Sequence, residues 1–409
     1  MKYLPLEKVD AGHTGYQQQV KEANIKRIFD LVRANKCKSR AEIVRSMNLS
    51  ATSVSVLVEE LTNRKLIDET GPTLTSLPGR RPISLQLNRD AHHMAIFSFS
   101  HEGVRYALLN LACEILENRF FPLDSRTITD ADPAEAYSRL LDDILRKRSK
   151  RFDPTKAIMV GASFPGIYIE RDQLFRTSPA LGFSLSEESI RHFHQRVGLP
   201  VYLLNSTRSM AYAEKKYLDG LDPTAPETQD LIFVRIQEGI NCAIIADGNI
   251  YPGPYNVSGE IGHYTIDYQG RPCPCGNQGC LERYVNLNAI LEDAREAAIG
   301  AGIEPPETLS DLAQRYADTP ALMASVRRSA QLLAFGLYSI MCSTGMRRVV
   351  LGGGIEILGE PFLQEVYHAL MGRTLLIRRL DLSYAKAGPD AEILGVAEYY
   401  LDKVFTITV

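Results

Sequence analysis

The sequence predicts an α/β body preceded by a small helical domain, and three observations carry this prediction. After residue 90, short apolar runs of strand character alternate with longer stretches of helical periodicity. Before residue 90, three helical patterns precede two strand-like runs. The length of 409 residues allows two or three domains. We therefore expect an N-terminal domain and a body of two lobes, with a cleft between the lobes as the usual place for a small ligand.

The composition is that of an ordinary globular chain, with 45% hydrophobic and 23% charged residues. No apolar run approaches the ~20 residues of a membrane-spanning helix, and the first residues lack an apolar signal core. We therefore expect a cytoplasmic protein whose seven cysteines are thiols or metal ligands. Residues 1–90 hold 15 Lys and Arg against 10 Asp and Glu, whereas the remainder holds 31 against 39. The basic first segment suggests an anionic partner.

The first ninety residues have the pattern of a helix-turn-helix. Apolar residues at helical spacing predict a helix over residues 18–35. Ser39 and Glu42 form a capping box for a second, short helix, and Ser50 caps a third helix over residues 50–64. The short turn before this third helix makes it the recognition helix. The residues that we expect it to present to bases or phosphates are small and polar: Ser50, Thr52, Ser53 and Ser55.

A wing follows the recognition helix. Strand-like runs at residues 66–69 and 83–87 flank a loop rich in Gly, Pro, Ser and Thr. Arg80 and Arg81 stand between prolines at the end of this loop, where they could enter a minor groove whose negative potential favours guanidinium groups. We therefore predict a winged helix-turn-helix over residues 1–90 that binds double-stranded DNA. The alternative is a three-helix protein-interaction module with an inert loop.

The body, residues 91–409, opens with a three-stranded meander and then alternates strand and helix. The expected strands are residues 94–99, 104–111, 113–121, 157–161, 201–204, 231–236, 243–247 and 349–354, the last running into a triple-glycine turn. The expected helices are residues 134–150, 186–197, 211–217, 289–298, 308–315, 321–343 and 360–373. A turn is expected at residues 163–166.

The body contains a cluster of metal-ligating residues within eighteen positions: His263, Cys273, Cys275 and Cys280. One imidazole and three thiolates can close a tetrahedral Zn²⁺ site. Because a site with four protein ligands has no open position, we expect one structural zinc ion per chain. Glu260 and Glu282 flank the cluster, so the loop would present both carboxylates and His263 to another molecule. The alternative is three buried cysteines and a chance histidine.

The motif from Gly259 to His263, Gly-Glu-Ile-Gly-His, and the run Cys-x-Cys-Gly-x-x-Gly-Cys-x-Glu that ends at Glu282 resemble the signature of the ROK family of repressors and sugar kinases. Residues 163–166 resemble the family's sugar-loop turn, residues 351–354 its late glycine motif, and the winged head its repressor branch. The resemblance covers nearly the whole chain.

This resemblance implies an actin-like, hexokinase-type body of two lobes. The small lobe would comprise residues 91–204 and about 390–409, and the large lobe residues 205–389 with the zinc site. One ring nitrogen of His263 would ligate zinc while the other faces a sugar hydroxyl. The residues that the resemblance implies for binding a sugar or sugar phosphate are Asn205, Glu260, His263, Glu282 and Gly166.

The sequence departs from the kinases of this family at three places. Residues 98–103 replace an Asp-x-Gly-Gly-Thr phosphate loop, and Glu102 would repel a phosphate. Residues 235–241 replace a second glycine-rich loop with a run that holds one glycine, so backbone N–H groups cannot cradle phosphates as closely. Ser206 stands where the kinases carry a catalytic Asp, and a hydroxyl is no general base at neutral pH. We therefore predict that the chain is not a kinase.

The sequence as a whole predicts a sugar-responsive transcriptional regulator, a repressor of carbohydrate-utilisation genes. The sugar would bind one state of the body better, and that state would hold paired DNA-binding heads at the wrong spacing. Recognition of half-sites implies a homodimer or tetramer. Two alternatives stay open: an active ATP-dependent sugar kinase with a fused DNA-binding head, and a DNA-bound regulator that answers to a protein partner.

Overall fold

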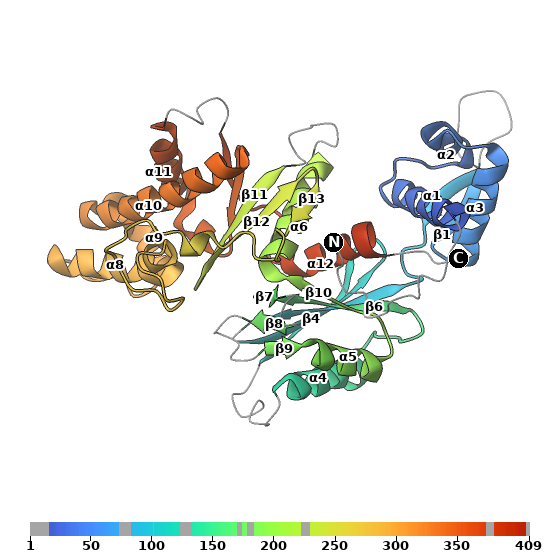
Figure 1. The fold of residues 1–409 in the computed structure, drawn as a ribbon, viewed down its shortest axis with the longest axis horizontal. Coiled ribbons are helices and arrows are strands. Elements are labelled where there is room, and N and C mark those ends of the chain that lie inside the picture. The colour runs from blue at the N-terminus through green and yellow to red at the C-terminus, as the bar shows by residue number, and fades with distance from the viewer. Residues whose placement is uncertain are drawn as a thin grey trace. The chain divides into compact units, whose positions relative to one another are not determined.

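The computed structural model describes residues 16–72, 83–100, 102–122, 133–169, 174–177, 184–221, 230–373 and 380–405 (Figure 1). The chain divides into two compact units. Unit 1 comprises residues 1–166, 174–204 and 396–409, and unit 2 comprises residues 167–173 and 205–395. Among the described helices, none has the length and apolar character that a membrane span requires.

The N-terminal head has the predicted order of elements, three helices followed by two antiparallel strands, and its helices fit a helix-turn-helix. Its helices are α1 (Tyr16–Arg33), α2 (Arg40–Met47) and α3 (Ala51–Asn63), and its antiparallel strands are β1 (Ile67–Pro72) and β2 (Ile83–Leu87). The apolar residues at helical spacing are buried, which confirms the periodicity argument for all three helices. The core of the head includes Ile25, Ile28, Phe29, Val32, Ile43, Val54, Val58, Leu61 and Ile67.

Short polar side chains fix both ends of the turn between α2 and α3. The Ser39 hydroxyl accepts a hydrogen bond from the backbone N–H of Glu42, and the Glu42 carboxylate accepts one from the N–H of Lys38. The Ser50 hydroxyl accepts from the N–H of Ser53 at 3.0 Å. Asn48 ends α2 in the left-handed conformation, with φ at 54°, which Asn tolerates better than most residues. These caps confirm the predicted starts of both helices.

Unit 1 also contains a five-stranded sheet in the order β10-β6-β3-β4-β5. Strands β3, β4 and β5 form an antiparallel meander, and β6 pairs with β3 in parallel. The predicted turn at residues 163–166 is shorter than expected, because Ser163 and Phe164 still belong to β6. The elements between residues 93 and 205 are β3 (His93–Phe99), β4 (Gly103–Asn110), β5 (Ile115–Pro122), α4 (Pro133–Asp143), the π-helix η2 (Ile144–Arg148), β6 (Ala157–Phe164), β7 (Gly166–Ile169), whose last three residues belong to unit 2, β8 (Leu174–Thr177), β9 (Ser184–Ser186), α5 (Glu187–Val197) and β10 (Val201–Asn205).

Unit 2 is built on a second five-stranded sheet in the order β13-β12-β11-β14-β15. An antiparallel meander, β11-β12-β13, is again extended by parallel strands, β14 and β15. The two sheets therefore repeat one topology. The elements are α6 (Ser206–Leu221), β11 (Leu231–Ile236), β12 (Ile240–Ala246), β13 (Asn249–Tyr251), η6 (Ile261–His263), α7 (Glu282–Val285), α8 (Leu287–Gly300), α9 (Leu309–Arg315), η7 (Tyr316–Asp318), α10 (Pro320–Thr344), β14 (Arg348–Gly352), η8 (Ile355–Leu358), α11 (Gly359–Met371), β15 (Asp381–Tyr384) and α12 (Ala391–Tyr399).

The core of unit 2 lies between this sheet and the helices α8, α10 and α11. Helix α10 is apolar along much of its length because it packs against both α8 and α11. Gly336 lets α10 pack closely against Leu281, the residue after Cys280. A Cβ at position 336 would lie 2.4 Å from Leu281 Cδ2. The core thus reaches directly beneath the loop that carries the candidate metal ligands.

The head is joined to the C-terminal end of the chain inside unit 1. Arg33, the last residue of α1, donates to Glu398 at 2.9 Å and also to Asp402. Both acids lie on α12 and the π-helix η9 (Tyr400–Val404) that continues it. Phe29 packs against Phe405, with ring centroids 5.7 Å apart. A paired and largely buried guanidinium therefore ties the head to a segment some 370 residues away in sequence.

Replacing Arg33 with Met should lower the free energy of unfolding of unit 1 by about 2 kcal/mol, because Glu398 and Asp402 would keep their burial and lose their cation. A matched control is Arg327→Met, which breaks the more exposed pair with Glu365 and should cost below about 1 kcal/mol. Chemical unfolding followed by circular dichroism measures both. Equal losses in the two variants would contradict this account of the head contact.

Candidate functional site

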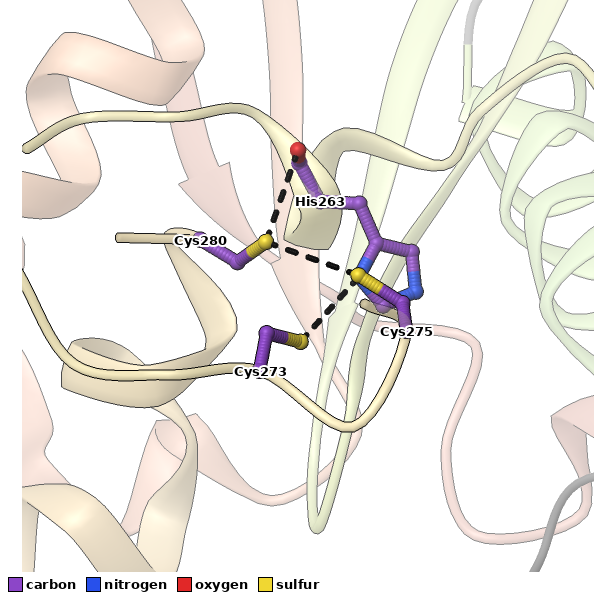
Figure 2. Close-up of side chains that lie close together, drawn as sticks. All are labelled: His263, Cys273, Cys275 and Cys280. Atoms are coloured by element: carbon purple, nitrogen blue, oxygen red, sulfur yellow. Dashed lines mark hydrogen bonds between the residues drawn. The ribbon is translucent and has the colours of Figure 1, made fainter. Parts of the chain in front are cut away.

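The four predicted metal ligands converge in the structure (Figure 2). His263 Nδ1 lies 3.7 Å from Cys273 Sγ, and the sulfurs of Cys275 and Cys280 are 3.8 Å apart. All four ligand atoms lie within 4.8 Å of one another. Cys273 and Cys280 are buried, whereas Cys275 is exposed. The residues can therefore hold a metal ion between one imidazole and three sulfurs.

The loop between these ligands is folded by its own backbone. Isolated bridges pair Thr265 with Cys280 and Pro272 with Gln278. Gly279 has a φ of 68°, and a Cβ on it would lie 1.5 Å from the carbonyl oxygen of Asp267. A larger residue would therefore force this backbone crossing apart. Gly279 therefore allows the chain to bring Cys280 next to His263, whose carbonyl oxygen lies 3.7 Å from Cys280 Sγ.

The surroundings of Cys275 and Cys280 shift the pKa values of their thiols in different directions. Burial raises the pKa of the Cys280 thiol to about 12, and the neighbouring thiols of Cys273 and Cys275 add to the rise. The backbone N–H of Asn277 leads the effects that lower the pKa of Cys275. A cation at the centre would supply the positive charge that three adjacent thiolates need, because a coordinating thiol is deprotonated.

Glu260 lies immediately before η6, and its carbonyl oxygen accepts from the N–H of His263 at 3.1 Å. Burial raises the pKa of its carboxyl group, while His263 and Arg208 oppose this rise. The side-chain amide of Asn241 is assigned the orientation that places its nitrogen toward Glu260. In this orientation the amide nitrogen donates to both carboxylate oxygens of Glu260, at 3.0 and 3.1 Å. Glu260 is thus a half-buried residue whose carboxylate is held by the Asn241 amide and whose backbone is held by His263.

Glu282 begins α7, and its Oε2 accepts from the N–H of Ile240 at 3.0 Å. Its charge contributes to the raised pKa of Glu260, so the structure brings the two acids within electrostatic range of each other. Gly239 lies beside this contact, since a Cβ on it would be 3.0 Å from Glu282 Oε2. Glu260, His263 and Glu282 therefore come together around the metal loop.

Asn205 is the last residue of β10, and its Oδ1 accepts from the N–H of Arg208 at 3.1 Å. Arg208 is buried and donates to the side-chain oxygen and the carbonyl oxygen of Asn256, at 2.7 and 2.9 Å. Arg208 also acts electrostatically on Glu260. Arg208 thereby connects Asn205, which binds its backbone N–H, to the loop that precedes Glu260, which its guanidinium binds. Gly166, the remaining predicted sugar contact, begins β7.

Ser206 is buried, and its hydroxyl accepts from the Arg235 guanidinium at 2.9 Å. Arg235 also donates to Glu392 at 3.3 Å. The predicted loop over residues 235–241 is a tight hairpin turn, because β11 ends at Ile236 and β12 begins at Ile240. Three of these interactions were not predicted, because their partners are far apart in the sequence. Arg208 and Asn256 are 48 positions apart, Arg235 and Ser206 are 29 apart, and Arg235 and Glu392 are 157 apart.

The predicted DNA-contacting residues of α3 lie at its exposed start. Ser50, Thr52 and Ser53 are exposed and Ser55 is half-buried. The hydroxyls of Ser50 and Ser53 lie 2.8 Å apart. Arg80 and Arg81 lie outside the described residues.

The chain belongs to the ROK family, whose model matches residues 102–403. It is 26% identical to a xylose repressor of Caldicellulosiruptor bescii over 94% of this chain and 95% of the relative. It is 27% identical to a xylose repressor of Bacillus subtilis over 94% of this chain and 97% of the relative. Its fold is similar to that of a ROK family transcriptional regulator, a homologue of the Escherichia coli MLC protein, with a TM-score of 0.79, 22% identity and coverage of 94% of this chain and 97% of that one. These findings confirm the predicted family and fold.

Replacing Gly279 with Ala should open the metal loop, because the new Cβ would collide with the Asp267 carbonyl. Gly276→Ala is a matched control: Gly276 also has a positive φ, of 91°, but no atom lies within 4 Å of a Cβ there. The control should cost only the backbone strain of about 1–2 kcal/mol. The rate at which a thiol reagent modifies Cys273 and Cys280 should rise in the Gly279 variant alone. Similar rates in both variants would contradict the crossing as the closing constraint.

Proposed function

We propose that this protein is a sugar-responsive transcriptional repressor that acts in the cytoplasm. The observation that carries the proposal is the extent of the similarity to proteins named xylose repressors, which spans almost the whole length of both chains. The similarity therefore includes both the winged head and the ROK body. A fold that supports several chemistries does not itself define function, so the site has to support the same conclusion.

The metal is a structural Zn²⁺, one per chain. In a tetrahedral site with Zn–S bonds of about 2.3 Å, neighbouring sulfurs stand about 3.8 Å apart. The sulfurs of Cys275 and Cys280 are 3.8 Å apart, which fits this sulfur–sulfur distance. One nitrogen and three sulfurs are also a common set of zinc ligands. When bound, the zinc would fix the loop and supply no reaction. The buried neighbours of Cys273 and Cys280 support a structural role.

The effector is a sugar held by polar groups around this loop. Carboxylates such as Glu260 and Glu282 accept charge-assisted hydrogen bonds from hydroxyl groups. His263 presents Nδ1 to the sulfurs, which leaves Nε2 for a ligand hydroxyl. Asn205 completes the set in unit 2, and Gly166 is the backbone contact proposed from β7. Ligand hydroxyl groups match this concentration of acceptors.

The chemistry around Ser206 supports binding without phosphoryl transfer. A kinase needs a base to accept the hydroxyl proton, whereas Ser206 Oγ accepts a hydrogen bond from a guanidinium. The hairpin turn between Ile236 and Ile240 is occupied by Glu238, whose charge opposes a phosphate. Both features support the proposal that the body has kept sugar recognition and lost kinase activity.

DNA binding is assigned to the head. Ser50, Thr52, Ser53 and Ser55 would meet the major groove, and Arg80 and Arg81 would enter a minor groove. Each head would read one half-site, so the active form is a homodimer or a tetramer. Sugar binding would favour a state of the body in which the heads no longer match the half-sites.

The experiment that tests this function is binding to labelled DNA from upstream of the protein's own gene, with and without D-xylose, D-glucose, N-acetylglucosamine and their phosphates. We expect binding that one compound of this panel weakens, and no transfer of phosphate from ATP to any sugar. Phosphorylation of a sugar would establish the kinase alternative. Binding that no sugar changes would favour a regulator that answers to a protein partner.

Purified without chelator, the protein should contain one equivalent of zinc per chain, measured by elemental analysis. Cys280→Ser should lose the metal and unfold at a lower temperature, because it removes a buried ligand. Cys342→Ser changes an exposed cysteine outside the cluster and should retain full zinc. A zinc content well below one equivalent in the unmodified protein would refute the assignment.

Glu282→Gln should abolish the rise in melting temperature that the effective sugar produces, because the amide is a weaker acceptor for hydroxyl groups. The variant keeps an oxygen that can accept from the N–H of Ile240, so folding, zinc content and DNA affinity should remain. A parallel loss of sugar response and zinc would make Glu282 a residue of the fold instead of the sugar site.

A further inference from the structure

The turn that follows α4 concentrates exposed positive charge on an acidic body. Residues 146–156 hold six Lys and Arg against one Asp, although acids outnumber bases over residues 91–409. Positive charge at a helix C-terminus interacts favourably with the helix dipole, but only over the last turn. The basic residues here continue beyond η2, which ends at Arg148. All six side chains are exposed: Arg146, Lys147, Arg148, Lys150, Arg151 and Lys156.

Local acids neutralise only part of this charge. Asp142 pairs with Arg146 at 2.6 Å, and Asp143 pairs with Lys147 and Arg148 at 3.1 and 2.7 Å. These pairs are exposed to water, so each contributes little and can be exchanged for another anion. In the described part of the chain, Lys150 and Arg151 form no ion pair. Their positive charges are therefore available to an external partner.

The backbone of this segment is anchored. Glu117 of β5, whose side chain is 9% exposed, accepts hydrogen bonds from the N–H groups of Lys150 and Arg151 at 3.1 and 3.2 Å. It also accepts from the Ser149 hydroxyl at 2.8 Å, and that hydroxyl in turn accepts from Tyr106 at 3.0 Å. A largely buried carboxylate thus holds the turn, whose basic side chains are exposed. Binding through such a turn loses little backbone entropy.

The head needs cations from outside its recognition helix. Helix α3 contains Glu59 and Glu60 and no Lys or Arg. Affinity for a duplex depends on Lys and Arg that neutralise phosphates, whichever sequence is read. The basic turn belongs to the same unit as the head, and the contact of Arg33 with Glu398 and Asp402 joins the head to that unit.

We propose that residues 146–151, the basic turn, form a second DNA-binding surface that contacts the phosphate backbone beside the half-site read by α3. The inference rests on the proposed function, since it assigns a further contact to the same DNA. The segment Arg-Lys-Arg-Ser-Lys-Arg carries no apolar side chain that could insert into a lipid bilayer. Its chemistry therefore fits a polyphosphate backbone better than a membrane surface.

The test compares Lys150→Gln/Arg151→Gln with the unmodified full chain on two duplexes, the upstream DNA and a scrambled sequence of equal length, over a series of salt concentrations. Two lost phosphate contacts should reduce the slope of log affinity against log salt by about 1.8, equally on both duplexes. Folding should be unchanged, because neither side chain forms an ion pair with a residue that the structure describes. Arg328→Gln, which removes an exposed cation from α10, should leave the slope unchanged.

A second variant is expected to change DNA affinity in the opposite direction. Asp143→Asn removes the carboxylate that pairs with Lys147 and Arg148, so it should tighten binding to both duplexes at low salt. An unchanged slope in the double variant, with DNA binding intact in the unmodified chain, overturns this inference alone. Failure of the unmodified chain to bind any DNA overturns the proposed function as well. Loss of binding to phosphatidylserine vesicles in the double variant, with its DNA slope retained, would assign the surface to a membrane instead.

Discussion

The convergence of one imidazole nitrogen and three sulfurs on a single point is the constraint on which the site depends. Between His263 and Cys280 the loop is closed by backbone hydrogen bonds, such as those from Ile266 N–H to Gly279 O and from Leu281 N–H to Tyr264 O, both 2.9 Å, and a bound metal would add four ligand bonds to them. Glu260 and Glu282 stand just outside these ends and interact electrostatically. Fixing the loop therefore fixes the spacing of two carboxylates and of the second nitrogen of His263. In the proposed sugar site, a rigid loop would hold these hydrogen-bond acceptors in position before the ligand binds.

The arrangement around Ser206 supports the proposal that the body binds a ligand without transferring a phosphoryl group. The hydroxyl of Ser206 is engaged by Arg235, which is itself paired with Glu392. A positive group at that position stabilises an internal ion pair and gives no base for proton abstraction. The sugar-contacting residues proposed nearby need no base, because they only bind. Under the proposed function, the body would recognise a sugar without catalysing a reaction on it.

Local signals allowed much of the fold to be predicted from the sequence. The caps at Ser39 and Ser50 and the apolar periodicity of the head involve residues three or four positions apart, and the metal cluster spans eighteen positions. Interactions across long separations could not be predicted, such as the pairing of Arg235 with Glu392 or of Arg33 with Asp402. Helix α6 begins at Ser206, five residues before the predicted start, because its first turn buries polar residues that interrupt the apolar pattern. The short strands β7, β8, β9, β13 and β15 carry too few residues to show a period.

Under the proposed function, sugar and DNA bind different states of one molecule. Because the coupling between two binding sites is reciprocal, it can be measured from either ligand. The affinity for the sugar that releases the protein from DNA can be measured by calorimetry with and without saturating upstream DNA. If the two ligands are coupled, DNA must weaken sugar binding by the same factor by which sugar weakens DNA binding. We predict equal factors. An affinity for sugar that does not change when DNA is bound would contradict the account.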